Sequence, residues 1–206
     1  MLKQIAARLG RVLALGLAAT MIAAPASAAK FYVSNQLGWV KPEDKVHVAT
    51  PQAVQLVIDF QTDGVSNAKA IKEVKPIIIK YVQQSTLFST VSDAPVPSGA
   101  LLTVRFNNIV DKGAAGKGFK VGLTFGLAAT QVADNYDVDL ALVPATGRDA
   151  MRTSLKHAII MTMGKGSDPT IGTEFKKPKE AVDAMVGQSV EQGVFALARQ
   201  DGFPGK

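Results

Sequence analysis

The sequence contains no cysteine among its 206 residues. This absence excludes disulfide bonds, thiol catalysis, thiol redox chemistry and cysteine-ligated metals. It also excludes the bacterial type of lipid anchor, which requires a cysteine at the cleavage point of the leader. The fold must therefore be held together by its hydrophobic core, and the chain is long enough to bury one.

Long hydrophobic runs are scarce as well. Residues 12–24 form an unbroken run of 13 apolar or small residues, whereas a membrane-spanning helix needs about 20. The run follows three basic residues and precedes Ala26-Ser27-Ala28, which is the order found in a secretory signal peptide. We expect residues 1–28 to be a leader cleaved after Ala28 and residues 29–206 to form a single α+β periplasmic domain. An uncleaved amino-terminal anchor is the alternative.

An excess of charge of one sign is also missing from the expected mature chain. Lys3, Arg8 and Arg11 lie in the leader, which has no acidic residue, so its removal lowers the formal net charge from +6 to +3. Such a balance favours solubility and does not amount to the basic footprint of a nucleic-acid-binding protein. We therefore expect no nucleic-acid partner.

The pattern of apolar residues predicts both strands and helices. Period-two alternation predicts strands at 51–64, 87–93, 100–110, 132–143 and 150–164. Helical spacing predicts helices at about 67–84 and 178–200, and residues 165–178 are predicted to be a loop. Clustered strands after a first helix indicate an α+β fold, an antiparallel or mixed β-sheet with both helices packed on one face.

Several residues predict local features of the helices and strands. Ser66 or Asn67 is expected to cap the first helix, and Pro76 either kinks that helix or begins it. Gly187 and Gly193 either weaken the second helix or allow it to approach the sheet closely. Asp137 and Asp139 are expected to lie opposite Arg152 and Lys156 on a solvated face. Phe31, Tyr32, Trp39 and Val40 are expected to cover the core, with an exposed contact as the alternative.

The glycine-rich segment GAAGKGFKVGLTFGLAATQ, residues 113–131, matches no nucleotide-binding loop. Gly118 stands where a phosphate loop needs a hydroxyl residue, and Val121 stands where a dinucleotide loop needs a third glycine. The segment alternates as a strand instead, with large apolar residues on one side and small ones on the other. A core strand is the default interpretation. The alternative is a partner or lipid contact made by Phe119, Val121, Leu123, Phe125 and Leu127.

Candidates for catalysis and metal binding are few. His157 could act with Ser154 and Asp137, but no nucleophile motif surrounds any serine, so a hydrogen-bonded structural histidine is the better hypothesis. Asp134, Asp137 and Asp139 lie on a predicted strand rather than in a glycine-containing calcium loop. We therefore predict no catalytic residue, no metal, no nucleotide and no cofactor.

The stretches PQAVQLVIDFQTDG, QSTLFSTVSD, LLTVRFNNI and GFKVGLTFGLAATQVADNYDV, followed by an amphipathic helix, resemble uncharacterised exported proteins of Gram-negative bacteria. More loosely, the layout is similar to small envelope lipoproteins that are auxiliary subunits of transport systems. The resemblance covers roughly residues 45–200. It implies an α+β periplasmic domain without enzymatic activity and supplies no catalytic residue. Those lipoproteins are anchored through a cysteine, which this chain lacks.

The sequence therefore predicts a non-enzymatic exported envelope protein that acts by binding, as a transport or envelope-assembly accessory. Its expected partner is an envelope protein or lipid, and a homo-oligomer is an open alternative. A second hypothesis is a self-assembling protein whose 119–142 hairpin inserts into the outer membrane. A third is a small-ligand binder or hydrolase that uses His157.

Overall fold

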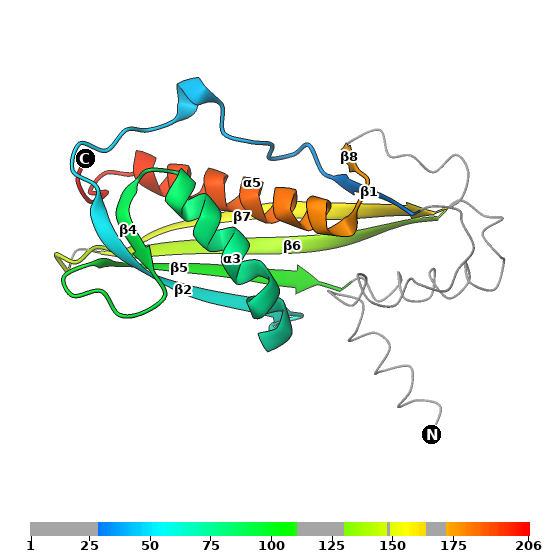
Figure 1. Ribbon diagram of the computed structural model, residues 1–206, viewed down its shortest axis with the longest axis horizontal. Helices are drawn as coiled ribbons and strands as arrows, with labels where there is room; N and C mark the ends of the chain where they lie inside the picture. The colour runs from blue at the N-terminus through cyan, green and yellow to red at the C-terminus, as the bar shows by residue number, and fades with distance from the viewer. Residues whose placement is uncertain (1–28, 111–129, 148, 164–171) are drawn as a thin grey trace.

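A computed structural model describes residues 29–110, 130–147, 149–163 and 172–206. They form an eight-stranded sheet with two helices on one of its faces (Figure 1). We call the opposite face, which carries no described helix, the open face. The predicted α+β fold, with two helices packed on one face, is confirmed. The sheet is mixed, because β2 pairs in parallel with β4 and β5 while the other pairings are antiparallel.

The element boundaries are close to those expected from the sequence. The strands are β1 (Lys30–Val33), β2 (Gln52–Thr62), β3 (Val65–Ser66), β4 (Phe88–Ser92), β5 (Ala100–Ile109), β6 (Thr130–Val143), β7 (Met151–Met163) and β8 (Thr173–Phe175). The helices are α3 (Ala68–Gln84) and α5 (Pro178–Arg199), with a short 3-10 helix η1 (Pro42–Asp44). The strand order is β3-β2-β5-β6-β7-β1-β8, and β4 also pairs with β2.

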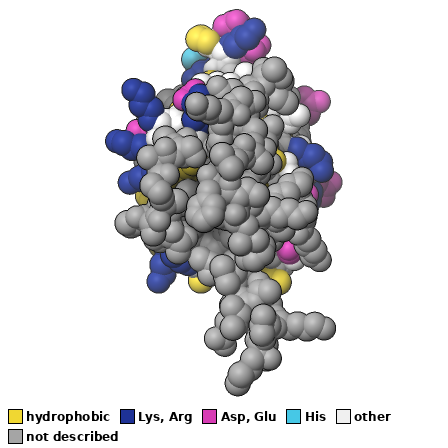
Figure 2. Space-filling view, turned by 90° about the vertical axis from the view of Figure 1, so that its right-hand side faces the viewer, with side chains coloured by type: hydrophobic (Ala, Val, Ile, Leu, Met, Phe, Trp, Pro, Cys, Tyr) yellow, Lys and Arg dark blue, Asp and Glu magenta, His cyan; other side chains and the backbone are white. Residues whose placement is uncertain are grey.

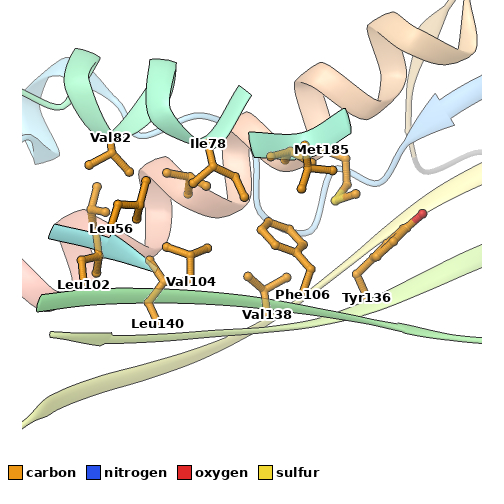
Figure 3. Close-up of a cluster of buried hydrophobic side chains, with 14 of the residues drawn as sticks. Leu56, Ile78, Val82, Leu102, Val104, Phe106, Tyr136, Val138, Leu140 and Met185 are labelled. Carbon is orange, nitrogen blue, oxygen red and sulfur yellow. The ribbon is translucent and has the colours of Figure 1, made fainter. Parts of the chain in front are cut away.

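The core lies between the helices and one face of the sheet. Strand alternation puts Leu102, Val104 and Phe106 of β5 on the helix side, and each is fully buried. Figure 3 shows these side chains beneath Ile78 and Val82 of α3. Burying each large apolar side chain contributes about 1.5–3 kcal/mol, which is how a chain without disulfides is stabilised.

Helix α3 begins as the sequence predicts. The Asn67 side chain accepts a hydrogen bond from the Ala70 backbone N–H at 3.1 Å, which satisfies one of the unpaired donors of the first turn. Ala70, Val74, Ile78 and Val82 follow at a spacing of four and are all buried. The helix runs through Pro76 rather than beginning there.

Gly193 of α5 permits close packing of the helix against the sheet. Close approach was one of the two alternatives that the sequence offered for this glycine. A Cβ added at Gly193 would lie 2.4 Å from Leu140 Cδ1, so only glycine lets the helix backbone lie this close to β6. Leu140 is 1 % exposed and packs directly beneath the helix.

Two expectations about the chain outside the central strands were wrong. Thr173–Phe175, within the predicted loop, forms strand β8 and pairs with β1, because β1 offers it a free sheet edge. Phe31 and Tyr32 belong to β1 and lie within the sheet rather than over it. Val40 is buried as expected, but Trp39 is 45 % exposed. The predicted leader, residues 1–28, lies outside the described residues.

Candidate binding site

The predicted contact residues Phe119, Val121, Leu123, Phe125 and Leu127 lie outside the described residues. Strand β5 precedes that segment in sequence and β6 follows it. The last residues of β5 and the first residues of β6 lie at the same end of the sheet, where β1 begins and β7 ends. Figure 2 views the molecule from this end, and basic and acidic side chains lie on both of its flanks. The other half of the proposed membrane hairpin, residues 130–142, is β6, which pairs with β5 on one side and β7 on the other.

The structure does not bring together the three residues of the hydrolase hypothesis. His157 lies on the helix side of β7, is 2 % exposed, and its Nε2 is 2.8 Å from Gln188 Oε1 of α5. Burial lowers the pKa of His157, which favours the neutral imidazole. Ser154 and Asp137 lie on the opposite, open face of the sheet. This histidine therefore joins a helix to the sheet.

The open face carries cross-strand polar pairs, as the sequence predicted in part. Lys156 Nζ lies 3.1 Å from Asp137 Oδ1 across β6 and β7. Asp139 instead accepts a hydrogen bond of 2.6 Å from Ser154, its direct cross-strand neighbour. Asp134 lies on the helix side, so the three aspartates of β6 do not converge. In the described ranges, no group of three or more histidine, cysteine or acidic side chains could hold a metal ion.

A row of polar residues crosses the helix side of the sheet near this end. Asn108, Tyr136 and His157 are direct neighbours on β5, β6 and β7, and all three are buried. Within the described part of the chain, His157 Nδ1 has no hydrogen-bond partner. Asp134 lies one step further along β6, partly buried, and burial raises its pKa to about 6. The row therefore places polar side chains inside an otherwise apolar core.

An exposed aromatic surface lies on the other side of the helices. The ring of Trp39 packs against the ring of Tyr81 on α3, with centroids 5.3 Å apart and planes inclined by 36°. Both rings rest on Gly187 of α5. A Cβ at this position would lie 2.5 Å from Tyr81 Cζ and 2.7 Å from Trp39 Cη2. Glycine inside a helix costs about 0.5–1 kcal/mol relative to alanine, and here its lack of a side chain makes room for the two rings.

The segment that carries Trp39 is fastened to α5 on both sides of the tryptophan. Gln192 Nε2 donates to the Gly38 carbonyl at 3.3 Å, and Gly38 adopts a positive φ of 68°. The Val40 N–H donates to Glu191 Oε2 at 3.1 Å, and Glu191 Oε1 also lies 2.9 Å from Lys45 Nζ. These contacts hold the tryptophan in an exposed position, although an apolar residue of this size is usually buried.

Charged groups surround the aromatic pair. The Tyr81 hydroxyl donates to Asp183 Oδ2 at 2.7 Å, and Lys80 Nζ lies 3.2 Å from both oxygens of Asp183. Burial raises the pKa of Tyr81, so the hydroxyl remains a donor to Asp183. Lys80 Nζ also lies 4.3 Å from the centroid of the Tyr81 ring. The group is a connected network rather than a set of separate surface charges.

Trp39 forms one wall of a shallow, open hollow of about 570 Å³ at the start of α5. Its other lining residues are Phe175 of β8 and Lys177, Lys179, Glu180, Asp183 and Ala184. The hollow therefore has an apolar wall and floor with a charged rim.

Sequence reasoning did not find this site, because its parts are far apart in the chain. Trp39, Tyr81 and Gly187 belong to three segments that meet only in the fold. The sequence contained two signals. An exposed contact was one of the two alternatives for Trp39, and Gly187 lay within a predicted helix. The glycine indicated close approach to the sheet, whereas Gly187 admits the rings of Trp39 and Tyr81.

Comparisons with known proteins show little similarity. No protein family and no curated protein sequence matches the chain. Among solved structures, the chain is similar to a single-substitution variant of the PelC dodecamer from Paraburkholderia phytofirmans, with 8 % identity over 79 % of this chain and 96 % of that one and a TM-score of 0.35. The PelC dodecamer from the same organism gives 9 % identity, 84 % and 99 % coverage and a TM-score of 0.35.

A structure titled as an uncharacterised protein gives 10 % identity, 73 % and 92 % coverage and a TM-score of 0.31. These similarities are too weak to indicate a function. Among the described residues, no helix is long and apolar enough to cross a membrane.

Proposed function

We propose that this chain is an exported, non-catalytic protein of the cell envelope that acts by binding, as an accessory to transport or envelope assembly. Export is proposed from the order of charged, apolar and small residues in positions 1–28, with cleavage after Ala28 and a periplasmic location. The single observation that carries the binding function is the hollow beside Trp39. It combines an exposed aromatic wall with a hydrogen-bonded charged rim.

The placement of the other reactive side chains supports binding over catalysis. His157 is sealed in the core against Gln188, and Ser154 is engaged with Asp139 on the far face. The residues around Trp39 are held by contacts from α3, α5 and the segment before η1. A site whose side chains are fixed before the partner arrives loses little conformational entropy on binding. Self-association is part of this proposal, with the partner then a second copy of the chain.

Site-specific crosslinking in intact cells tests the binding function. A photoreactive amino acid would replace Lys179 on the rim of the hollow, and a matched variant would carry it at Lys156 on the open face. We expect an envelope adduct from position 179 that is lost when Trp39→Ala is added, and none from position 156. Equal adducts from both positions, or no adduct from position 179, would overturn the assignment of the hollow.

Cell fractionation and amino-terminal sequencing test the export part separately. We expect the mature chain in the periplasmic fraction, beginning at Ala29. A chain that retains residues 1–28 and stays with the inner membrane would instead identify those residues as an anchor.

A further inference from the structure

We infer that the hollow beside Trp39 binds a hexose ring of a carbohydrate, an inference that rests on the proposed binding function. The argument starts from Trp39 itself. Its side chain is 45 % exposed while Tyr81 and Gly187 support it from beneath. An indole ring has a flat apolar surface with a negative face. The C–H groups on one face of a pyranose form a complementary patch that is flat, apolar and slightly positive.

The rim of the hollow matches the edge of such a ring. Asp183 accepts hydrogen bonds from Tyr81 and Lys80, and Glu180 Oε1 lies 3.7 Å from Lys177 Nζ. Each carboxylate therefore lies next to a cation, and the hollow offers both donors and acceptors. Neighbouring hydroxyl groups of a sugar both donate and accept, and charged partners make such hydrogen bonds strong.

The charge of the hollow argues against an ionic ligand. Its lining has two lysines, Lys177 and Lys179, and two acids, Glu180 and Asp183, so the formal charges cancel. A phosphate or a polyanion would meet as many carboxylates as ammonium groups, whereas a neutral polyol meets a balanced set. A wholly apolar ligand would displace water from the charged groups of the rim without offering them hydrogen bonds in return, which is unfavourable.

Fluorescence provides a direct assay because Trp39 is the sole tryptophan of the chain. The purified exported protein would be titrated with cellohexaose, maltohexaose and chitohexaose. We expect at least one of them to shift the emission of Trp39 in a saturable manner. If none of the three changes the emission and none gives a calorimetric signal, the inference is refuted.

Variants place the binding in the hollow. Calorimetry with the oligosaccharide that binds should show at least a tenfold loss of affinity for Trp39→Ala. Gly187→Ala should show a similar loss, because both rings must move although every lining side chain is kept. Val65→Ser is the matched control, since Val65 is 70 % exposed on β3 and does not line the hollow. Circular dichroism checks that each variant folds. Unchanged affinity in both hollow variants would overturn the site.

The result is separable from that of the cell crosslinking. An adduct from position 179 without oligosaccharide binding refutes the carbohydrate inference and leaves the binding function in place. Oligosaccharide binding that Trp39→Ala abolishes supports both. If neither an adduct nor oligosaccharide binding is found, both the carbohydrate inference and the assignment of the binding function to the hollow are refuted.

Discussion

Asp134 gives the sharpest prediction about stability. It lies on the helix side of β6, next along that face from Tyr136, and opposite Ile159 of β7. Burial raises its pKa from 3.8 to about 6. The ionised carboxylate is therefore disfavoured in the folded protein relative to the unfolded chain. The change Asp134→Asn removes the charge while nearly preserving the shape of the side chain.

The magnitude follows from this pKa. At about 1.36 kcal/mol for each tenfold change in proton affinity, a pKa that rises from 3.8 to about 6 corresponds to about 3 kcal/mol. The folded state holds the proton more tightly than the unfolded state. Stability is thus greatest below the unfolded pKa, falls as the pH rises towards about 6, and stays low above it. The side chain keeps partial exposure, so 3 kcal/mol is an upper value.

Urea unfolding of both proteins tests this at low and neutral pH. We expect Asp134→Asn to be more stable than the parent by about 2–3 kcal/mol at pH 7.5, with most of this advantage absent at pH 4. Comparing the variant with the parent at each pH cancels the contributions of other ionisable groups. An advantage that does not change between the two pH values, or a less stable variant at pH 7.5, would refute the reasoning.

Three further predictions concern the core and the first helix. Phe106→Ala should lower the free energy of unfolding by about 3–5 kcal/mol, because Phe106 is fully buried; a loss below 1 kcal/mol in urea would contradict its core position. Asn67→Ala should cost about 1 kcal/mol through loss of the helix cap, and an unchanged Tm would show that the cap contributes nothing. His157 should titrate below its ordinary pKa of 6.5 in NMR titration, since burial lowers its pKa; a midpoint above 6.5 would contradict its burial against Gln188.

The central strands and both helices could be predicted from the sequence because their signals are local. Val138 and Leu140 alternate with Asp137 and Asp139, and Asn67 stands one residue before the start of α3. Strands β1 and β8 have four and three residues, too few to show a period, and their pairing depends on chain segments that are distant in sequence. A three-residue strand forms where a neighbouring edge offers hydrogen bonds, and this is a property of the fold.

The candidate site was hidden from sequence reasoning for a related reason. The exposure of Trp39 depends on Gln192 and Glu191, which fasten its segment to α5 from more than 150 positions away. Gly187 could be recognised as a close approach, but its partner could not be named before the two helices were placed. The contact residues favoured from the sequence, 119–127, lie outside the described residues and stay a prediction.

Hydrogen–deuterium exchange tests the central claim most directly. The purified protein, residues 29–206, would be compared in the absence and presence of a detergent-solubilised envelope extract. We predict added protection in peptides that contain Trp39 and in those that cover Phe175 to Gly187, with β5, β6 and β7 unchanged. Protection on those three strands alone, or no added protection anywhere, would contradict binding through the hollow.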